Sequence, residues 1–378
     1  MRVHVESTGL ARFGRRPESL VELLAEAGSA ALDGIGRKPV DAVFVGTMAA
    51  GSLSGVENVT GQLADRLGLG SAAGWRVEAA SATGAAVFHS AAMAVASGQF
   101  RRVLVVAGEK MSGPPTADVA RILARSLAPQ EQAAGATMPA LAAIVAQLYS
   151  ARHGTTTGVF DLVTVLARAA AARNPMAQFS TPVTAEEVAA SRMVSTPLRL
   201  LHCSAMTDGA AALILAKGDG AASVLGLGQG FDELLVSDRE DVTSFRASRV
   251  AAERAYTMAK LTRKEVVFAE LHDAFAPFLL IDLEDIGACG PGEAGRWLES
   301  GAVAPEGRFP VNPSGGLLGR GHPVGASGLA QIIEVSRQLS QEAGPTQLPH
   351  AGSVGLALSI GGLASHNFVT ILGHRGGN

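Results

Sequence analysis

The sequence predicts an α/β protein made of two related halves, with a longer helical segment inserted into the first half. Three observations support this prediction. Short runs rich in β-branched residues alternate with helical patterns, which is typical of a mainly parallel sheet with helices on its faces. From Met111 to Ser204 the alternation stops, and helical, proline-broken, more charged sequence takes its place. After this segment, the second half repeats the pattern of the first.

The first half contains two predicted strands and two predicted helices. The runs VDAVFVGT (Val40–Thr47) and RRVLVVAGEK (Arg101–Lys110) are short and rich in valine, which favours buried strands. Helical patterns extend from Ser19 to Gly34 and from Ala85 to Gly98, and each ends at a glycine. The strand DGAAALILAK (Asp208–Lys217) returns the chain to the sheet after the inserted segment.

The second half offers counterparts of these elements. The strand VVFAELHDAF (Val266–Phe275) resembles the strand at Val40, and Gly315–Gly328 leads into a helix, as the residues around Ser81 do. Residues Val354–Gly373 predict a closing pair of strands. Two such sheets could pack about a shared pair of helices, with a site where their loops meet. The predicted boundaries are an N-terminal half at 1–112 that returns at 205–220, a loop or cap domain at 113–204, and a C-terminal half at 221–378.

The composition limits the classes of partner. The 378 residues carry a formal charge of −3, which gives no electrostatic reason to expect nucleic acid or an anionic membrane. The first residues contain no apolar signal core, and the longest apolar run falls short of the roughly 20 residues that span a bilayer. The two cysteines, Cys203 and Cys289, form neither a disulfide framework nor a metal-binding spacing. We expect a cytoplasmic protein without a metal.

The most specific stretch is NPSGGLLGRGHPVGASG, from Asn312 to Gly328. Its glycines allow the backbone to approach a ligand closely, and Pro323 stiffens the turn that presents His322. This segment resembles the GHP signature of the thiolase superfamily. Three further stretches resemble elements of the sterol-carrier-protein-x-type and archaeal branch of that family: AGEKMS (107–112), SRMVSTPLRLLHCSAMTDGAAALIL (191–215) and LHDAFAP (271–277).

The resemblance covers nearly the whole chain and implies the fold, the substrate and the partners. It implies a five-layered αβαβα thiolase fold with a cap-like loop domain that selects the acyl chain. No cofactor would be bound, and a coenzyme A thioester would be the substrate, in lipid metabolism. The implied assembly is a homodimer or a dimer of dimers. A small accessory protein with a zinc ribbon and an OB-fold is a further implied partner.

The resemblance also implies roles for individual residues. His322 falls on the histidine that activates the nucleophile, and His272 falls on the position that completes the first oxyanion hole. Backbone N–H groups near Ser81 and Gly361 match the second oxyanion hole. Such preplaced donors suit any acyl transfer, because negative charge develops on the thioester oxygen in the transition state. The predicted substrate loop includes Asn312, Gly321 and Gly325.

The sequence departs from the family at both reactive thiols. Ser81 stands where the resemblance places the nucleophilic cysteine, and neither Cys203 nor Cys289 aligns with a catalytic position; both are expected to be ordinary small buried residues. A serine attacks only if a base takes its proton during the step, and His322 could do so. The acid/base cysteine is also missing, since its two family positions hold Ser359 and Ala274.

The remaining candidates for the base are His322, His272, Asp273 and His366, and Ser359 is a weaker one. Ser81 could also be a helix N-cap, or a serine introduced in place of cysteine, and both alternatives stay open. Thr83 and Gly84 are expected to shape the turn after it. His89 is expected to lie away from the site. Four basic residues could meet the phosphates of coenzyme A, although a solvated face is the default: Arg173, Arg192, Arg199 and Arg320.

The predicted function is a thiolase-like acyl-CoA C-acyltransferase that makes or cleaves a C–C bond in an acyl thioester. One alternative is a catalytically weakened subunit that acts with a zinc-ribbon/OB-fold partner. Another is a retro-aldolase on β-hydroxyacyl-CoA, which needs a base and an oxyanion hole but no acylated nucleophile. A dinucleotide oxidoreductase is disfavoured, because no GxGxxG motif follows the first strand.

Overall fold

The structure of the protein is a computed structural model that describes residues 3–374. Its strands are β1 (Val3–Gly14), β2 (Ala42–Gly46), β3 (Ala73–Val77), β4 (Arg102–Glu109), β5 (Met193–Ser195), β6 (Leu198–Arg199), β7 (Asp208–Lys217), β8 (Ser223–Phe231), β9 (Phe268–Glu270), β10 (Val354–Gly361) and β11 (His366–Gly373). Its longer helices are α1 (Leu20–Asp33), α4 (Thr83–Ala96), α7 (Met138–His153), α8 (Thr157–Ala171), α10 (Arg246–Ala259), α11 (Ala276–Asp285) and α14 (Ser327–Ser340). Its shorter helices are α2 (Ala50–Ser54), α3 (Val59–Leu67), α5 (Thr116–Ala124), α6 (Pro129–Ala133), α9 (Ala185–Ala190), α12 (Ala294–Glu299) and α13 (Gly316–Arg320), with 3₁₀ turns at Leu200–His202, Val236–Asp238, Arg263–Glu265 and Gly344–Thr346.

The main sheet consists of two half-sheets joined at their edges. Its strand order is β3-β2-β4-β7-β1-β8-β11-β10-β9. Strands β1 and β8 meet at the residue pair His4–Ser223, whereas the other neighbouring strands share longer ladders. The first five strands in this order belong to the N-terminal half and the last four to the C-terminal half.

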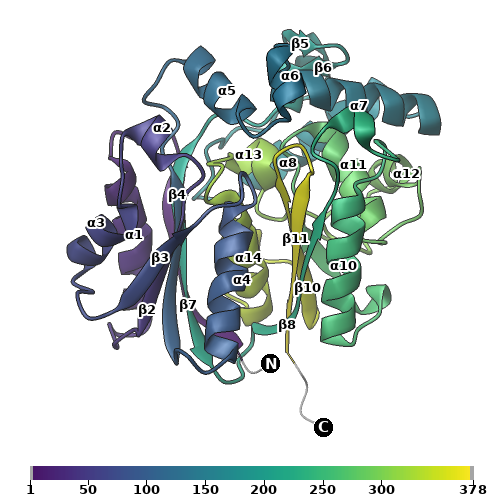
Figure 1. Cartoon of the computed structure of the whole chain (residues 1–378). Coiled ribbons are helices and arrows are strands. Elements are labelled where there is room, and N and C mark those ends of the chain that lie inside the picture. The colour runs from purple at the N-terminus through teal and green to yellow at the C-terminus, as the bar shows by residue number, and fades with distance from the viewer. Residues whose placement is uncertain (1–2, 375–378) are drawn as a thin grey trace.

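Helices cover both half-sheets and separate them (Figure 1). Helix α1 packs on β1, β4 and β7, and α10 packs on β8 and β11. Helices α4 and α14 contact each other and strands of both half-sheets, so they form the shared middle layer. The order of layers is therefore helix, sheet, helix pair, sheet, helix.

The two halves repeat one strand arrangement. In the first, β2 and β4 are parallel, and β7 and β1 follow as antiparallel neighbours. In the second, β9 and β10 are parallel, and β11 and β8 follow in the same way. The helices α4 and α14 precede the equivalent strands β4 and β10. The prediction of two related halves about a shared pair of helices is confirmed.

The predicted strand at Val266–Phe275 is too long, because β9 ends at Glu270. The next amide, that of Leu271, donates to the Asn312 side-chain oxygen at 2.6 Å instead of continuing the ladder. The chain then turns, and α11 begins at Ala276. His272 therefore lies in a short loop after the strand.

Strands β1 and β8 are not among the elements that the sequence predicts. In β8, glycines alternate with larger residues, and a Cβ added at Gly228 would lie 1.8 Å from the Ala251 carbonyl oxygen. These glycines therefore serve the close approach of α10 to the sheet, and they weaken the strand signal in the sequence.

The segment between β4 and β7 forms a layer of helices over the loops of both halves. It contains α5 to α9 and the β5–β6 hairpin, and α5, α6, β5 and β6 lie at the top of Figure 1. Helix α8 packs on α11 and α13 of the C-terminal half, so this layer is attached to both halves. No helix within residues 3–374 is long and apolar enough to cross a membrane.

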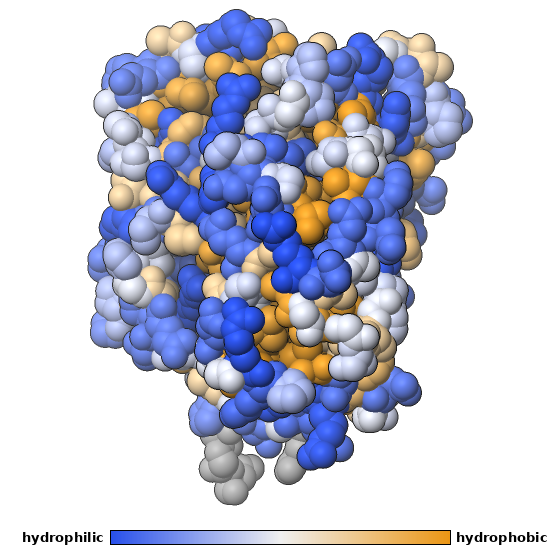
Figure 2. Space-filling view, turned by 90° about the vertical axis from the view of Figure 1, so that its left-hand side faces the viewer, coloured by the Kyte–Doolittle hydropathy of each residue, from blue (hydrophilic) through white to orange (hydrophobic). Residues whose placement is uncertain are grey.

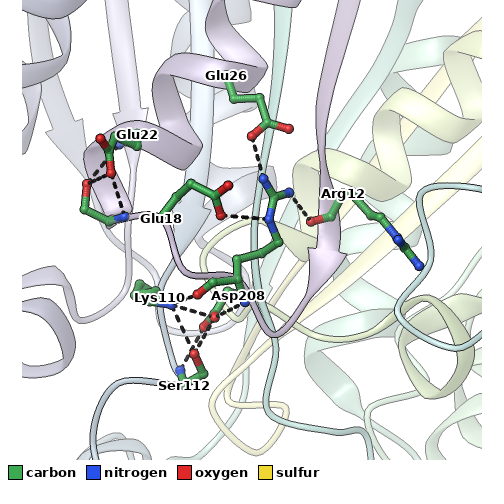
Figure 3. Close-up of polar contacts among 9 residues, drawn as sticks. Arg12, Glu18, Glu22, Glu26, Lys110, Ser112 and Asp208 are labelled. Atoms are coloured by element: carbon green, nitrogen blue, oxygen red, sulfur yellow. Dashed lines mark hydrogen bonds and ion pairs between the residues drawn. The ribbon is translucent and has the colours of Figure 1, made fainter.

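Asp208, the first residue of β7, connects the end of the inserted segment to its beginning just after β4 (Figure 3). Its carboxylate accepts hydrogen bonds from the amides of Met111 and Ser112 at 2.7 and 2.8 Å, and from the Lys110 ammonium group at 2.9 Å. Burial alone would raise the pKa of Asp208, but the hydrogen bonds from Lys110 and Ser112 hold it below its usual value. An ionised carboxylate thus connects both ends of the inserted segment.

Candidate functional site

A cavity of about 160 Å³ lies beneath the inserted helices, and Ser81, His272 and His322 all line it. Ser81 comes from the N-terminal half, and the two histidines come from the C-terminal half. The rest of the wall is mostly apolar and includes Met48, Met111, Leu123, Met138, Met206 and Phe278. Three residues that are distant in the sequence and able to do chemistry therefore share one apolar space.

Ser81 stands in the turn between β3 and α4, just before the helix. Its hydroxyl donates a hydrogen bond to the Ile360 carbonyl oxygen at 2.9 Å. Helix α4 begins at Thr83, its N-cap is Ala82, and no side chain caps it. Ser81 is therefore not a helix N-cap, and that alternative is wrong.

The turn itself is held by Thr83. Its hydroxyl donates to the Ala80 carbonyl oxygen at 2.6 Å and accepts from the Ala79 amide at 2.8 Å. Gly84 has a different part: a Cβ there would lie 2.4 Å from the Leu329 nitrogen of α14. Thr83 thus shapes the turn, whereas Gly84 lets the two central helices touch.

His322 is held by hydrogen bonds to both its backbone and its ring. Its amide donates to the Thr207 hydroxyl at 2.9 Å, and its Nδ1 lies 2.7 Å from the Ser327 hydroxyl. Because Ser327 donates its one proton to the Pro323 carbonyl oxygen at 3.0 Å, the hydroxyl accepts from Nδ1–H. This assigns the tautomer and leaves the lone pair on Nε2 free to act as a base.

His272 faces His322 with ring centroids 5.1 Å apart and ring planes at 89°. The His272 amide donates to an Asp282 carboxylate oxygen at 3.2 Å, and its Nδ1 is buried without a partner in the described part of the chain. Burial lowers the pKa of His322 to about 3, and burial and the neighbouring His322 lower the pKa of His272 well below its usual value. Both rings are therefore neutral near pH 7, when an imidazole can still donate one N–H to an oxygen.

Asp273 and Asn312 lie behind the cavity and position the loops that form it. The two Asp273 oxygens accept from the amides of Leu317 and Leu318 at the start of α13, at 2.6 and 3.4 Å. Burial raises the pKa of Asp273 to about 6, against the opposing effect of these amides. Neither residue lines the cavity, so Asp273 is not placed to exchange a proton with a substrate there.

The other predicted site residues lie next to residues that line the cavity but do not line it themselves. The Ser359 hydroxyl is buried without a partner among residues 3–374, and it faces α14, where a Cβ at Gly328 would lie 2.6 Å from it. The Gly361 amide donates weakly to the Asn367 oxygen at 3.4 Å, and its neighbours Ile360 and Gly362, not Gly361 itself, line the cavity. Gly321 and Gly325 lie in the loop around His322, where an added Cβ would lie 2.9 Å from the Thr207 hydroxyl oxygen and 2.5 Å from the Gly108 carbonyl oxygen, respectively.

Outside the cavity, Arg320 differs from expectation, whereas His89 lies away from the cavity as expected. Arg320 is 2% exposed and lies 3.9 Å from Glu270, so its expected position on a solvated face is wrong. His89 is packed between α4 and β11, with Nε2 2.9 Å from the Thr370 hydroxyl. His366 does not line the cavity; its Nδ1 lies 3.0 Å from Ser365.

Sequence reasoning missed Cys203, which lines the cavity, and Glu109, which holds the backbone of the cavity residue Met48. Glu109, at the end of β4, accepts from the amides of Met48 and Ala49 at 2.8 and 3.3 Å, and burial raises its pKa to about 7. The only signal for it was its place in AGEKMS. Cys203 lines the cavity and is only partly buried, so the expectation that it is a buried residue is wrong. No group of His, Cys, Asp and Glu within residues 3–374 has the arrangement of a metal site.

Comparisons with known proteins match both halves. The model of the thiolase N-terminal domain matches residues 5–219, and the model described as thiolase C-terminal domain-like matches residues 228–374. Acetyl-CoA acetyltransferase of Methanothermobacter thermautotrophicus is 39% identical over 355 residues, which are 91% of this chain and 92% of that protein. Sterol carrier protein 2 of Bos taurus is 34% identical over 223 residues, 56% of this chain and 41% of that protein.

A solved structure has the same fold as this chain. The Ltp2-ChsH2(DUF35) aldolase superposes with a TM-score of 0.84 at 27% sequence identity, over 99% of this chain and 98% of that chain. Together these similarities confirm the predicted five-layered fold class.

Proposed function

Because the chain belongs to the thiolase superfamily, in its sterol-carrier-protein-2 type, we propose that it makes or cleaves a C–C bond in an acyl-CoA thioester. Ser81 is the nucleophile of this C-acyltransferase, and no resident cofactor takes part. The observation that supports the proposal is that Ser81, His272 and His322 line one cavity.

His322 acts as the base for Ser81. The free lone pair on Nε2 takes the hydroxyl proton as Oγ attacks the thioester or ketone carbon. The Ser327 hydroxyl holds the opposite nitrogen protonated, as the third member of a nucleophile–base–orienter series. The depressed pKa of His322 means that the base is present in its active neutral form at neutral pH.

His272 stabilises the oxyanion. Its neutral ring is buried and supplies an N–H there, and a preplaced donor in a buried site is worth several kcal/mol, roughly a 10²–10³-fold effect on rate. After it has taken the Ser81 proton, His322 becomes a second donor. Backbone amides near Ser81 and Gly361 remain the proposed second oxyanion hole.

The acyl group occupies the methionine-rich part of the cavity. A cavity of about 160 Å³ is close to the volume of about 150 Å³ that accommodates a benzene ring. The proposed substrate therefore carries an apolar acyl group of about six carbons or one aromatic ring. Methionine side chains adapt their shape, which suits a family of related acyl groups.

The proposed assembly is a homodimer formed through the edge of the N-terminal half-sheet. Strand β3 is the outermost strand there, and Trp75 on it is 47% exposed. Figure 2 shows the side of the molecule on which α1, α2 and α3 lie, where hydrophobic residues are exposed in a band between polar ones. An accessory protein with a zinc ribbon and an OB-fold is a second proposed partner; the paired name of the Ltp2-ChsH2(DUF35) aldolase supports a search for it.

A retro-aldolase acting on β-hydroxyacyl-CoA is the second candidate. It is favoured by the similarity to that aldolase and by the absence of cysteine at Ser359 and Ala274. Such a lyase would use His322 or His272 as its base and would not need Ser81. The Ser81 hydroxyl therefore separates the two candidates.

The test compares the wild-type protein with Ser81→Ala on 3-oxoacyl-CoA plus CoA, and on β-hydroxyacyl-CoA, with acyl groups of two to ten carbons. The acyltransferase predicts cleavage of the 3-oxoacyl-CoA, best near six carbons, and an added acyl mass on Ser81. Ser81→Ala should then lose about 10³-fold or more in kcat. Ser90→Ala, on the helix α4 that follows Ser81 and with its hydroxyl donating to the Ala86 carbonyl oxygen, is the matched control and should keep full activity.

Two results would contradict the acyltransferase. One is cleavage of β-hydroxyacyl-CoA that is unaffected in Ser81→Ala, which assigns the lyase instead. The other is the absence of turnover by the wild-type protein on every thioester in the panel, both alone and with a zinc-ribbon/OB-fold partner.

A further inference from the structure

The cavity contains one thiol, that of Cys203, among its lining residues from the described chain. We infer that Cys203 is the proton donor to the carbanion released when the C–C bond breaks, and the base that removes this proton in the reverse direction. This inference rests on the proposed function, and it supplies the acid/base group that the reaction needs. The positions where the sequence suggests such a group, Ser359 and Asp273, do not line the cavity.

Cys203 begins a short segment that runs between the two histidine-bearing loops. At one end, Cys203 forms a backbone bridge with Phe275, and the Ser204 amide donates to the Ala274 carbonyl oxygen at 2.9 Å. At the other end, Met206 forms a bridge with His322. The segment is thus bonded to the loop of His272 and to the loop of His322, and all these residues line the cavity.

Cys203 lines the same cavity as Ala274 and Phe275. The bridge from Cys203 to Phe275 places their segments side by side, and residues paired in this way carry their side chains on one face. The thiol therefore faces the cavity from the segment next to the loop that holds Ala274.

The other cavity groups with exchangeable protons are two imidazoles and four hydroxyls, those of Ser81, Ser126, Thr137 and Ser204. An alcohol is a far weaker acid than a thiol, so these hydroxyls are poor proton donors to a carbanion. The two imidazoles already have proposed roles, since His322 is the base for Ser81 and His272 stabilises the oxyanion.

The environment of Cys203 keeps the thiol protonated until the carbanion forms. Its Sγ donates to the Arg199 carbonyl oxygen at 3.5 Å. Burial raises the pKa of the Cys203 thiol to about 12, so the neutral form dominates near pH 7. A neutral thiol is the form that a proton donor requires, whereas a nucleophilic cysteine would need a lowered pKa.

His272 indicates independently that a polar ligand belongs in this cavity. It is 1% exposed, lines the same space, and its Nδ1 has no partner among residues 3–374. A buried polar nitrogen without a partner is costly, and a thioester oxygen or a bound water would supply one. The thiol therefore shares its cavity with a group that awaits a ligand.

The proposed cleavage balances in protons and electrons. Ser81 Oγ attacks C3 of a 3-oxoacyl-CoA, and its proton moves to Nε2 of His322. The C2–C3 bond breaks, its electron pair stays on C2, and Cys203 Sγ gives its proton to C2 to complete the departing acyl-CoA. The protonated His322 then returns its proton to the Cys203 thiolate. CoA attacks the acyl group on Ser81, and the CoA S–H proton passes through the neutral His322 to Ser81 Oγ, so this half of the cycle does not use the thiol.

The test separates carbanion chemistry from acyl transfer. Wild type, Cys203→Ala and Cys203→Ser are compared in three assays: cleavage of 3-oxohexanoyl-CoA with CoA, exchange of the α-protons of hexanoyl-CoA in D2O, and acylation of Ser81 by hexanoyl-CoA, read by intact mass. In both variants, cleavage and exchange should fall by about 10²–10³-fold. Acylation of Ser81 needs no carbanion and should be unchanged.

Cys289→Ala is the matched control, because Cys289 lies in a different groove, and it should behave as wild type in all three assays. If wild type cleaves the substrate and Cys203→Ala retains both cleavage and exchange, the inference is overturned while the proposed function stands. Equal loss of acylation and cleavage in a folded Cys203→Ser indicates a packing role and also overturns it. Exchange that survives in Cys203→Ala but is lost in His272→Gln assigns the proton transfer to the imidazole. If the wild-type protein is inactive in all three assays, both the proposed function and this inference are contradicted.

Discussion

Burial sets the charge of the histidines in this protein. His89 and His322 are both more than nine-tenths buried, and burial lowers the pKa of each to about 3. An imidazolium in such surroundings would lose its hydration without gaining a carboxylate partner. For His322 the consequence bears on the proposed function, because a neutral ring can act as a base. For His89, distant from the cavity, the consequence is for stability alone.

Replacing His89 by Gln should flatten the acid limb of the stability curve. Burial lowers the pKa of His89 to about 3 in the folded protein, whereas the unfolded value is about 6.5. Between these two values the unfolded chain binds one proton more than the folded chain, so stability falls as the pH falls, by about 1.4 kcal/mol per pH unit. From pH 7 to pH 4.5, urea titrations should show that wild type loses about 2–3 kcal/mol more than His89→Gln.

The exposed His350 provides the control for this measurement. His350→Gln should follow the wild-type curve at both pH values. Equal losses for wild type and His89→Gln would mean that His89 is not held neutral in the folded protein.

The two central helices are held at the distance that the site requires by a pair of glycines. Gly84 of α4 and Gly328 of α14 occupy equivalent positions in the two halves. A Cβ at Gly84 would lie 2.4 Å from the Leu329 nitrogen, and one at Gly328 would lie 2.8 Å from the Ala85 nitrogen. Since Ser81 precedes α4 and His322 precedes α14, this crossing affects the distance between the proposed nucleophile and its proposed base.

Gly84→Ala should therefore reduce both stability and activity. The added methyl group meets backbone atoms of α14, which can move only as a unit, so we expect a loss of about 2 kcal/mol or more. Gly158→Ala, at an exposed position of α8 with no close neighbour, should instead stabilise the protein by about 0.5–1 kcal/mol. Thermal unfolding of both variants checks this. A Gly84→Ala protein with wild-type melting temperature and kcat would refute the role of the crossing.

The inserted helices form a separate element with a separate task. Leu123 of α5 and Met138 of α7 supply the apolar wall opposite the reactive groups, while Asp208 holds both ends of the insertion. Selectivity for the acyl group can thus change in this element without disturbing the half-sheets. We therefore expect the chain-length preference to depend on the insertion, whereas Ser81, His272 and His322 belong to the halves.

At the scale of the whole molecule, the exposed edge strand β3 is the feature that most favours self-association. An edge strand presents unpaired N–H and C=O groups, and β3 carries the exposed Trp75. Trp75→Glu places a charge at the proposed interface and should convert a dimer into a monomer, measured by light scattering after size-exclusion chromatography. Leu234→Glu, which changes an exposed leucine of the C-terminal half, should leave the mass unchanged.

An unchanged dimer mass for Trp75→Glu would show that the dimer interface does not involve Trp75. A monomeric wild-type protein at micromolar concentration would contradict the proposed homodimer.

The fold was largely predictable because its signals are local. The strands β2, β4 and β7 and the helices α1 and α4 are found close to their predicted limits. The failures have long-range causes. Strand β9 ends early because the Leu271 amide donates to the Asn312 side chain. The glycines of β8 are explained only by the close packing of α10 on that strand.

The candidate site was predictable only in part. Ser81, His272 and His322 could be named from motifs, and the structure brings them to one cavity. Asp273 and Ser359 stand in equally suggestive motifs, but their side chains face away from that cavity. No local pattern distinguishes the two cases, because the direction of a loop side chain depends on the hydrogen bonds that hold the loop.

The sequence by itself determined the two related halves, the position of the insertion and the motifs that carry a serine and two histidines. These depend on residue type and spacing, which are properties of the chain before it folds. Only the tertiary structure decided which polar groups share the cavity, and it admitted Cys203 while excluding Asp273. The physical reason is that bridges such as those from Cys203 to Phe275 and from Met206 to His322 join segments that are far apart in the chain, and such pairings leave no mark on either segment alone.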